Sequence, residues 1–272
     1  MQLANAPIAP IATTVHLMLA RNSHAPETPA DRAGTWPPCG DAGRIAEMLK
    51  MLADRLSIRR RLLQAGETVY GAGERFANLW VVNSGCFKIV NTSADGRNQV
   101  VGLQFRGDWL GCDGIAMGRY GSEAVALDTS EVWALRYDAL LQAGTAHPPL
   151  LAGLHTEMSR AIAHGRDSMV SMCTLPVTAR VANYLLYWVE SLSGRGQRTD
   201  QIMLRMTRAE IGNYLGMTLE SVSRAFSRLA RNKLIRFPEK GRRDILIPDL
   251  RALTEFIQEN SNLTGTTVKC AR

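Results

Sequence analysis

The pattern of apolar and polar positions changes character twice along this chain. Apolar residues recur at helical spacing over residues 44–53, which predicts a short amphipathic helix. Beyond it, short segments of alternating apolar and polar residues are separated by glycines, at 67–70, 79–82, 86–90, 99–105 and 131–135. Short strands divided by glycine turns predict a small antiparallel barrel or jelly roll. The Asp95-Gly96 pair between two of these segments predicts a hairpin turn.

A long helical pattern follows over residues 148–172. Its apolar positions fall largely on one stripe, made of Leu151, Leu154, Met158, Ile162 and Met169. Near-heptad spacing favours packing against a second copy of the chain, and packing on the barrel would give the same periodicity. Pro176 predicts a hinge, because proline disfavours helical geometry in the residue before it. A second helical pattern follows over residues 177–192.

Residues 207–229 fit a helix-turn-helix position by position. Gly216 stands at the turn, where the backbone needs a positive φ that glycine adopts without strain. Gly212 is small where the second helix crosses the first. Thr218 is placed to cap the second helix by accepting a hydrogen bond from its first turn. The apolar positions expected to anchor the two helices inward are Ile211, Leu215, Val222 and Phe226.

The remaining positions of the second helix point outward, where a recognition helix meets base edges and phosphates. They are Leu219, Glu220, Ser223, Arg224 and Ser227 or Arg228. Apolar segments at 234–237 and 245–247 bracket a basic stretch at 239–243, which predicts a two-stranded wing with a basic tip. These features predict a winged helix that binds DNA. The side chains expected on the DNA backbone are Thr207, Arg208, Thr218, Ser221, Arg228, Arg242 and Arg243.

Composition and charge support this assignment. The chain has 272 residues, enough for one large domain or two ordinary ones, and its 46% hydrophobic and 21% charged residues are typical of a globular protein. Ten arginines and two lysines face five acids between Arg195 and Asp244, a surplus of seven that equals the net charge of the whole chain. A surplus confined to one segment indicates a nucleic-acid-binding domain. The alternative is a solvated basic face without a partner.

Other features limit the compartment and the chemistry. Residues 1–43 hold six of the eleven prolines, which predicts a flexible extension without its own core. The sequence has no run of 18 apolar residues and no basic stretch before its first apolar residues, so we expect no membrane partner and no secretory signal. Its five widely spaced cysteines form no disulfide framework or zinc motif, so we expect a cytoplasmic protein without metal or cofactor. The absence of a nucleophile–base pair or Walker-type loop argues against an enzyme.

The order of a barrel, a long helix, a hinge and a winged helix resembles the CRP/FNR superfamily of bacterial transcription regulators. The resemblance covers residues 45–255 and is closest to the FNR branch, through the strings at 102–108, 110–115 and 206–224. It implies an α+β fold with a cyclic-nucleotide-binding-like β-barrel (jelly roll), a long dimerisation helix and a C-terminal winged helix-turn-helix. It also implies a homodimeric activator that binds double-stranded promoter DNA and contacts RNA polymerase.

Within this resemblance, Glu220, Ser223 and Arg224 match the Glu-x-x-Ser-Arg spacing of FNR-like proteins, which implies palindromes of TTGAT half-sites. The chemistry agrees, since arginine donates two hydrogen bonds to guanine and glutamate accepts from the amino group of cytosine or adenine. The implied division is an extension at 1–43, a sensor barrel at 44–145, a dimerisation helix at 146–175, a winged helix-turn-helix at 176–262 and a tail at 263–272.

The resemblance also bears on what the barrel senses. A cyclic-nucleotide pocket needs a Gly-Glu pair and an arginine, but Cys112 follows Gly111 here and Tyr120 stands at the arginine position. An FNR-type [4Fe–4S] cluster needs four thiolates, whereas the N-terminal region supplies only Cys39 and Trp133 occupies the barrel position. We therefore expect neither form of control, and we take Cys112, Tyr120 and Trp133 as the sensor candidates of the barrel. Haem, a redox thiol at Cys112 or no ligand remain open. The alternative function is a regulatory module, gated by haem, a redox thiol or a nucleotide, whose basic domain binds a non-promoter partner.

Overall fold

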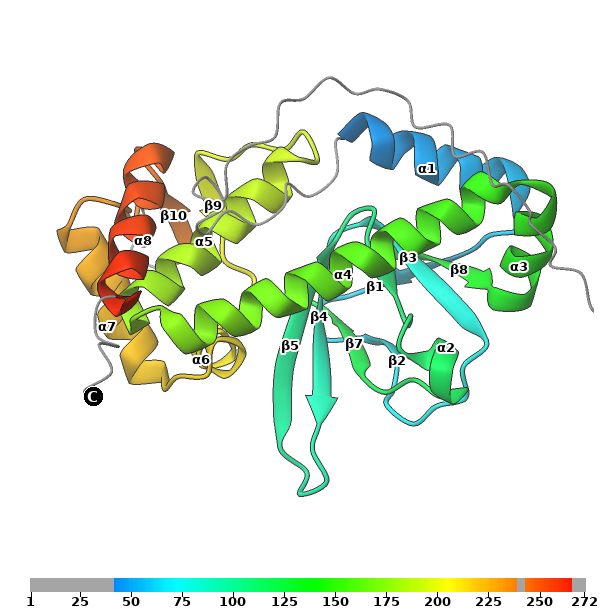
Figure 1. The fold of residues 1–272 in the computed structure, drawn as a ribbon, viewed down its shortest axis with the longest axis horizontal. Helices are drawn as coiled ribbons and strands as arrows, with labels where there is room; N and C mark the ends of the chain where they lie inside the picture. The colour runs from blue at the N-terminus through cyan, green and yellow to red at the C-terminus, as the bar shows by residue number, and fades with distance from the viewer. Residues whose placement is uncertain (1–41, 239–242, 266–272) are drawn as a thin grey trace, which may run out of the picture. The chain divides into compact units, whose positions relative to one another are not determined.

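The computed structural model describes residues 42–238 and 243–265 (Figure 1). Most of the predicted extension at 1–43, the end of the tail and the tip of the wing with Arg242 lie outside the described residues. The first element is helix α1 (Ala42–Arg55), which confirms the helix predicted at 44–53 and buries Ile45, Leu49 and Leu52. Among the described helices, none is both long and apolar enough to cross a lipid bilayer.

Two four-stranded antiparallel sheets form the β-barrel. The strand order is β1-β8-β3-β6 in one sheet and β2-β7-β4-β5 in the other. The predicted strands are confirmed as β2 (Thr68–Tyr70), β3 (Asn78–Ser84), β4 (Cys86–Thr92), β5 (Asn98–Phe105) and β8 (Ser130–Arg136). The hairpin between β4 and β5 turns at the predicted position, where Gly96 has a φ of 80°. Residues of both sheets, such as Val82 and Phe87, share one buried cluster.

Four elements of the barrel escape the sequence pattern. They are β1 (Arg59–Leu63), β6 (Trp109–Leu110), β7 (Glu123–Ala126) and the short helix α2 (Gly114–Met117). β1 is an edge strand with four exposed residues in a row, and only Leu63 is buried, so it shows no alternation. β6 has two residues, both buried, and is too short to display a period.

Three helices follow the barrel: α3 (Tyr137–Ala146), α4 (Pro148–Thr174) and α5 (Val177–Ser193). α4 and α5 confirm the two helical patterns, whereas α3 was not predicted. Between α4 and α5, the backbone of Leu175 is extended, with φ −85° and ψ 138°, and Pro176 is the N-cap of α5. The chain therefore breaks its helix where the proline predicts a hinge. Most of α5 is buried, including Leu185 and Trp188.

The C-terminal part contains β9 (Gln201–Met203), α6 (Arg208–Leu215), α7 (Leu219–Arg231), β10 (Asp244–Leu246) and α8 (Leu250–Gly265). Its small sheet differs in detail from the predicted wing. β10 pairs antiparallel with β9, and Arg236 of the expected first wing strand makes a single bridge to Leu246. β9 precedes the helix-turn-helix in sequence. The pattern at 234–247, from which the wing was predicted, therefore could not identify β9 as the partner of β10. α8, also not predicted, buries Leu253 and Ile257 in the core of this part.

Candidate nucleic-acid interface and sensor cavity

Threonine caps fix the start of both helices of the helix-turn-helix. The Thr207 hydroxyl accepts a hydrogen bond from the Glu210 N–H at 3.2 Å, and the Glu210 carboxylate accepts one from the Thr207 N–H at 2.8 Å. This reciprocal pair closes a capping box on α6. Thr218 caps α7 as predicted, accepting from the Ser221 N–H at 3.2 Å. Local hydrogen bonds thus set where each helix begins.

Two glycines make the turn between α6 and α7 possible, as predicted. Gly216 has a φ of +65°, which strains any other residue. A Cβ added to Gly212 would lie 2.6 Å from the carbonyl oxygen of Met217, so the turn passes too close for a side chain. The four anchoring positions are buried as predicted: Ile211, Leu215, Val222 and Phe226.

The outward face of α7 is open to solvent. Glu220, Arg224 and Arg228 are exposed, and Ser223 is half-buried. Ser223, Arg224 and Arg228 line one surface hollow with the start of α5. The backbone amide of Glu220 and the Thr218 hydroxyl hold the pKa of the Glu220 carboxyl below its usual value. At neutral pH the face therefore offers an acceptor carboxylate, a hydroxyl and guanidinium donors side by side.

Arg208 contacts two aromatic rings that the sequence pattern does not connect to it. Its guanidinium lies 3.3 Å from the ring centroid of Phe226 on α7 and 5.9 Å from that of Phe237. Such cation–π contacts stabilise by electrostatic attraction to the ring face. Arg208 therefore links α6 to α7. It also borders a second hollow with Thr207 and the exposed Arg243.

Two protein-family models match the chain. A cyclic nucleotide-binding domain matches residues 60–147, and a Crp-like helix-turn-helix domain matches residues 179–256. The transcriptional regulatory protein btr of Bordetella pertussis is 33% identical over 223 residues, which are 82% of this chain and 90% of that protein. The chain belongs to the CRP/FNR family of transcription regulators.

Further relatives agree with this assignment. The transcriptional activator protein FnrA of Stutzerimonas stutzeri is 31% identical over 182 residues, 67% of this regulator and 75% of FnrA. FixK2 of Bradyrhizobium japonicum has a similar structure, with a TM-score of 0.64 and 25% identity over 74% of this regulator and 97% of FixK2. The regulator is thus a DNA-binding helix-turn-helix protein of a non-enzymatic family, as the sequence predicts.

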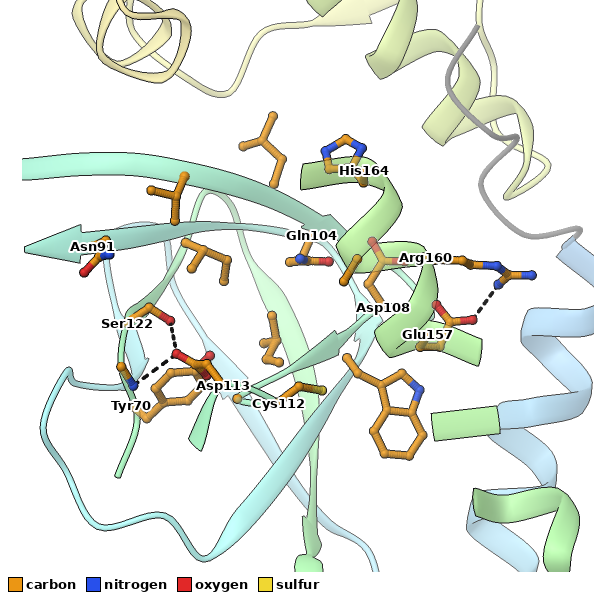
Figure 2. A pocket seen from close by; sticks show the side chains of 18 of the residues that line it. Tyr70, Asn91, Gln104, Asp108, Cys112, Asp113, Ser122, Glu157, Arg160 and His164 are labelled. Atoms are coloured by element: carbon orange, nitrogen blue, oxygen red, sulfur yellow. Dashed lines mark hydrogen bonds and ion pairs between the residues drawn. The ribbon is translucent and has the colours of Figure 1, made fainter. Parts of the chain in front are cut away.

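The regulator's barrel borders, with α4 and α5, a cavity of about 490 Å³ (Figure 2). On its wall the Asp113 carboxylate accepts hydrogen bonds from the Gly121 N–H at 3.0 Å and the Ser122 hydroxyl at 2.8 Å. Among the described residues that line the cavity, Arg160 is the one arginine, and it pairs with Glu157 at 2.5 Å. These residues do not fit the phosphate of a cyclic nucleotide, because a carboxylate already occupies the donors and the arginine has its own partner.

Tyr120 and Trp133, two of the predicted sensor candidates, are core residues of the barrel. Tyr120 is 4% exposed, stacks on Tyr70 with ring centroids 4.0 Å apart, and donates its hydroxyl to the Asn78 carbonyl at 2.8 Å. Trp133 is 6% exposed and donates its indole N–H to Glu131 at 2.8 Å. Neither is among the described residues that line the cavity.

Cys112, the third candidate, does line the cavity. Burial raises the pKa of its thiol to about 12, and the carboxylates of Asp113 and Glu157 add to the shift. A thiol in this state is protonated at neutral pH and is a weak nucleophile. Burial beside two carboxylates therefore argues against redox sensing by Cys112. Burial also lowers the pKa of His164, which lines the same cavity from α4, to about 4.

The stripe predicted for dimerisation divides into two halves along α4. Leu151, Leu154 and Met158 pack into the cluster of the barrel, α1 and α3. Ile162 is 55% exposed and Met169 is 67% exposed. The first half thus packs on its own barrel, and the second half leaves an apolar surface.

Proposed function

We propose that the regulator binds promoter DNA as a homodimer and activates transcription from palindromes of TTGAT half-sites. The observation that carries this proposal is the open face of α7, with Glu220, Ser223 and Arg224 near the start of a capped helix. Arginine there matches the O6 and N7 atoms of guanine, and the carboxylate matches a base amino group. The name of FnrA, a transcriptional activator, supports activation and hence contact with RNA polymerase.

In this proposal, different residues contact the DNA bases and the DNA phosphate backbone. Glu220, Ser223 and Arg224 determine sequence, and residues around them hold phosphates and set the register. We propose that the DNA backbone is contacted by Thr207, Arg208, Thr218, Ser221, Arg228, Arg242 and Arg243. In a homodimer the two α7 helices would enter successive major grooves about 34 Å apart.

The second half of the α4 stripe supports the homodimer. Ile162, Met169 and Val170 are large apolar residues that are each more than half exposed. A helix that keeps such a row in water has an unburied apolar face, which a second α4 would cover. We propose residues 146–175 as the dimerisation segment between a sensor at 44–145 and a DNA-binding domain at 176–262.

A fluorescence-anisotropy titration tests the proposed function. The purified regulator is titrated against TTGAT-N4-ATCAA duplex and a scrambled duplex, in air, at fixed salt and without added ligand. We expect selective binding to the palindrome, which would also show that oxygen does not inactivate the protein. Equal affinity for both duplexes would contradict the assignment of Glu220, Ser223 and Arg224 to base edges.

Arg224→Ala separates base recognition from general DNA affinity. Loss of a bidentate contact to guanine costs about 1–3 kcal/mol of discrimination, so the preference for the palindrome over the scrambled duplex falls roughly 5- to 150-fold for each half-site. The control Arg243→Ala weakens both duplexes alike and lowers the salt slope of log K by about one for each subunit of the dimer. An Arg224→Ala variant that keeps the full preference would show that another residue selects the guanine.

A further inference from the structure

The side-chain amide of Asn213 joins α6 to one edge of the sensor's second sheet. β5 is an edge strand of the sheet β2-β7-β4-β5. The Asn213 Oδ1 atom accepts the Val100 N–H at 2.5 Å, and its Nδ2 atom donates to the Asn98 carbonyl at 2.8 Å. The Gln99 side-chain amide donates in turn to the Asn213 carbonyl. Asn213 therefore occupies the place on β5 that a further strand would take.

An ion pair holds the first turn of the same helix. Lys88 on β4 lies 2.5 Å from the carboxylate of Glu210, and their side chains are 19% and 30% exposed. Glu210 is also the capping-box residue that pairs with Thr207. The carboxylate that organises the start of α6 thus ties it to the barrel as well.

Arg195 forms a buried contact at the other end of β5. It follows α5, and its side chain is 1% exposed. Its guanidinium donates to the Asp108 carboxylate at 2.7 Å, to the Arg106 carbonyl at 2.6 Å and to the Ser191 carbonyl at 2.7 Å. It also lies 5.1 Å from the ring centroid of Phe105. Arg195 therefore inserts into the turn that leads from β5 to β6.

Apolar packing lies between these polar contacts and joins them into one interface. The ring of Phe105 on β5 meets that of Trp188 on α5 edge to face, with centroids 5.0 Å apart. The Tyr187 hydroxyl donates to the Leu103 carbonyl at 3.2 Å. Residues of β5 and of the helix-turn-helix belong to one buried cluster. The DNA-binding domain is thus packed along β5 over most of the length of that strand.

We propose that Asn213 and Arg195 are positioning residues, which fix the orientation in which each subunit presents α7 to DNA. Glu220, Arg224 and Arg228 stay exposed while the interface is formed, so it leaves the DNA-facing side open. A domain held in one orientation favours one separation of half-sites, because the second half-site is bound at a high effective concentration only where the geometry fits. This inference rests on the proposed binding of a homodimer to a palindrome.

Two variants and a control test the positioning role. Asn213→Ala removes the contact with β5, and the paired change Asp108→Asn with Arg195→Gln removes the ion pair without leaving a buried charge unpaired. Asn91→Ala on β4, an exposed asparagine, is the matched control. Each full-length protein is titrated against palindromes whose spacer is the N4 length or one or two base pairs shorter or longer, and against a duplex with a single half-site.

We expect the native regulator and Asn91→Ala to prefer one spacer length strongly. In both test variants that preference falls at least about fivefold, while affinity for the single half-site stays unchanged, because α7 itself is intact. Amide hydrogen exchange at Val100, which needs no DNA, should be faster in Asn213→Ala.

Two results would overturn the inference: an unchanged spacer preference in both variants, or tighter binding of every duplex by them, which would make the interface a restraint on DNA binding. A native regulator that does not distinguish the palindrome from a scrambled duplex would instead contradict the proposed function. Asn213 is half-buried, so its variant keeps the test decisive if the Arg195 pair variant fails to fold.

Discussion

At Gly212 the helix-turn-helix has room for a hydrogen atom and nothing larger. The Met217 carbonyl oxygen would lie 2.6 Å from an added Cβ, and it belongs to backbone that cannot move without opening the turn. Gly212→Ala should therefore destabilise the protein by about 1–3 kcal/mol, measured by urea unfolding. Gly153→Ala on α4 is the control, because among the described residues no atom other than its chain neighbours and the nearby backbone of its own helix lies within 4 Å of its added Cβ. The control should be neutral or stabilise the protein by up to about 1 kcal/mol. Equal stability of the two variants would contradict the close approach of the Met217 carbonyl oxygen to Gly212.

Glu190 on α5 makes stability depend on pH. Burial raises the pKa of its carboxyl to about 7, and its Oε2 atom accepts no hydrogen bond in the part of the chain that the structure describes. The folded state therefore holds this proton more tightly than the unfolded state. Its contribution to stability is complete below pH 4.5 and is lost as the pH rises through about 7.

Glu190→Gln should remove the loss of folding stability that the ionising carboxyl of Glu190 causes as the pH rises. We expect the Tm of the variant to exceed that of the native protein by about 2–4 °C at pH 8 and the difference to vanish toward pH 4. Burial of His164, with its pKa lowered to about 4, acts in the opposite direction between pH 4 and 6.5. It is present in both proteins and cancels in the difference. Glu47→Gln, at an exposed position on α1, is the control; a Tm difference independent of pH would show that Glu190 is not the titrating group.

Residue roles that depend on neighbours in sequence could be predicted, and those that depend on distant partners could not. The cap at Thr218 and the glycine at 216 follow from local backbone geometry, and both are confirmed. Arg195 was counted with the basic surplus, yet its partner Asp108 lies 87 residues away and its side chain is buried. Counting charges along a sequence cannot separate an arginine on the surface from one inside an interface.

At the scale of elements, the apolar stripe of α4 packs on the barrel in its first half and is exposed in its second half, which we propose for dimerisation. Met169→Glu places a charge on the half that faces away from the barrel, where Met169 is 67% exposed. Because a dimer would bury two such charges close together, we expect the variant to be monomeric by size-exclusion chromatography with light scattering. Met117→Glu on α2, where the methionine is 80% exposed, should leave the oligomeric state unchanged. A Met169→Glu protein with the native mass would place the dimer contact elsewhere.

Elements that bury one face could be predicted from their period, and elements that serve as edges or connections could not. α4 and α5 are long enough to show helical spacing, and β3 and β5 alternate over part of their length. β1 is exposed at four of its five positions, and β9 and β10 have three residues each. Their place in a sheet is decided by a partner strand rather than by their own residues.

At the scale of the molecule, the sensor cavity lies where the barrel, α4 and α5 meet, so a ligand there would touch both domains. The carboxylate of Asp113 occupies the donors of Gly121 and Ser122. Cyclic AMP should therefore leave the Tm unchanged within about 1 °C, even at millimolar concentration. It should also leave the affinity for the TTGAT palindrome unchanged. A concentration-dependent rise in Tm would show that the cavity accepts the nucleotide despite its carboxylate.

The amide of Asn213 has a consequence for how this regulator can be divided. A fragment that ends at the hinge keeps the whole barrel but removes α6, and it uncovers the edge of β5 together with the ring of Phe105. An uncovered, partly apolar edge strand is a template for pairing with strands of other molecules. We therefore expect the DNA-binding domain to protect the barrel from aggregation, and a fragment truncated at Pro176 to self-associate through this sheet.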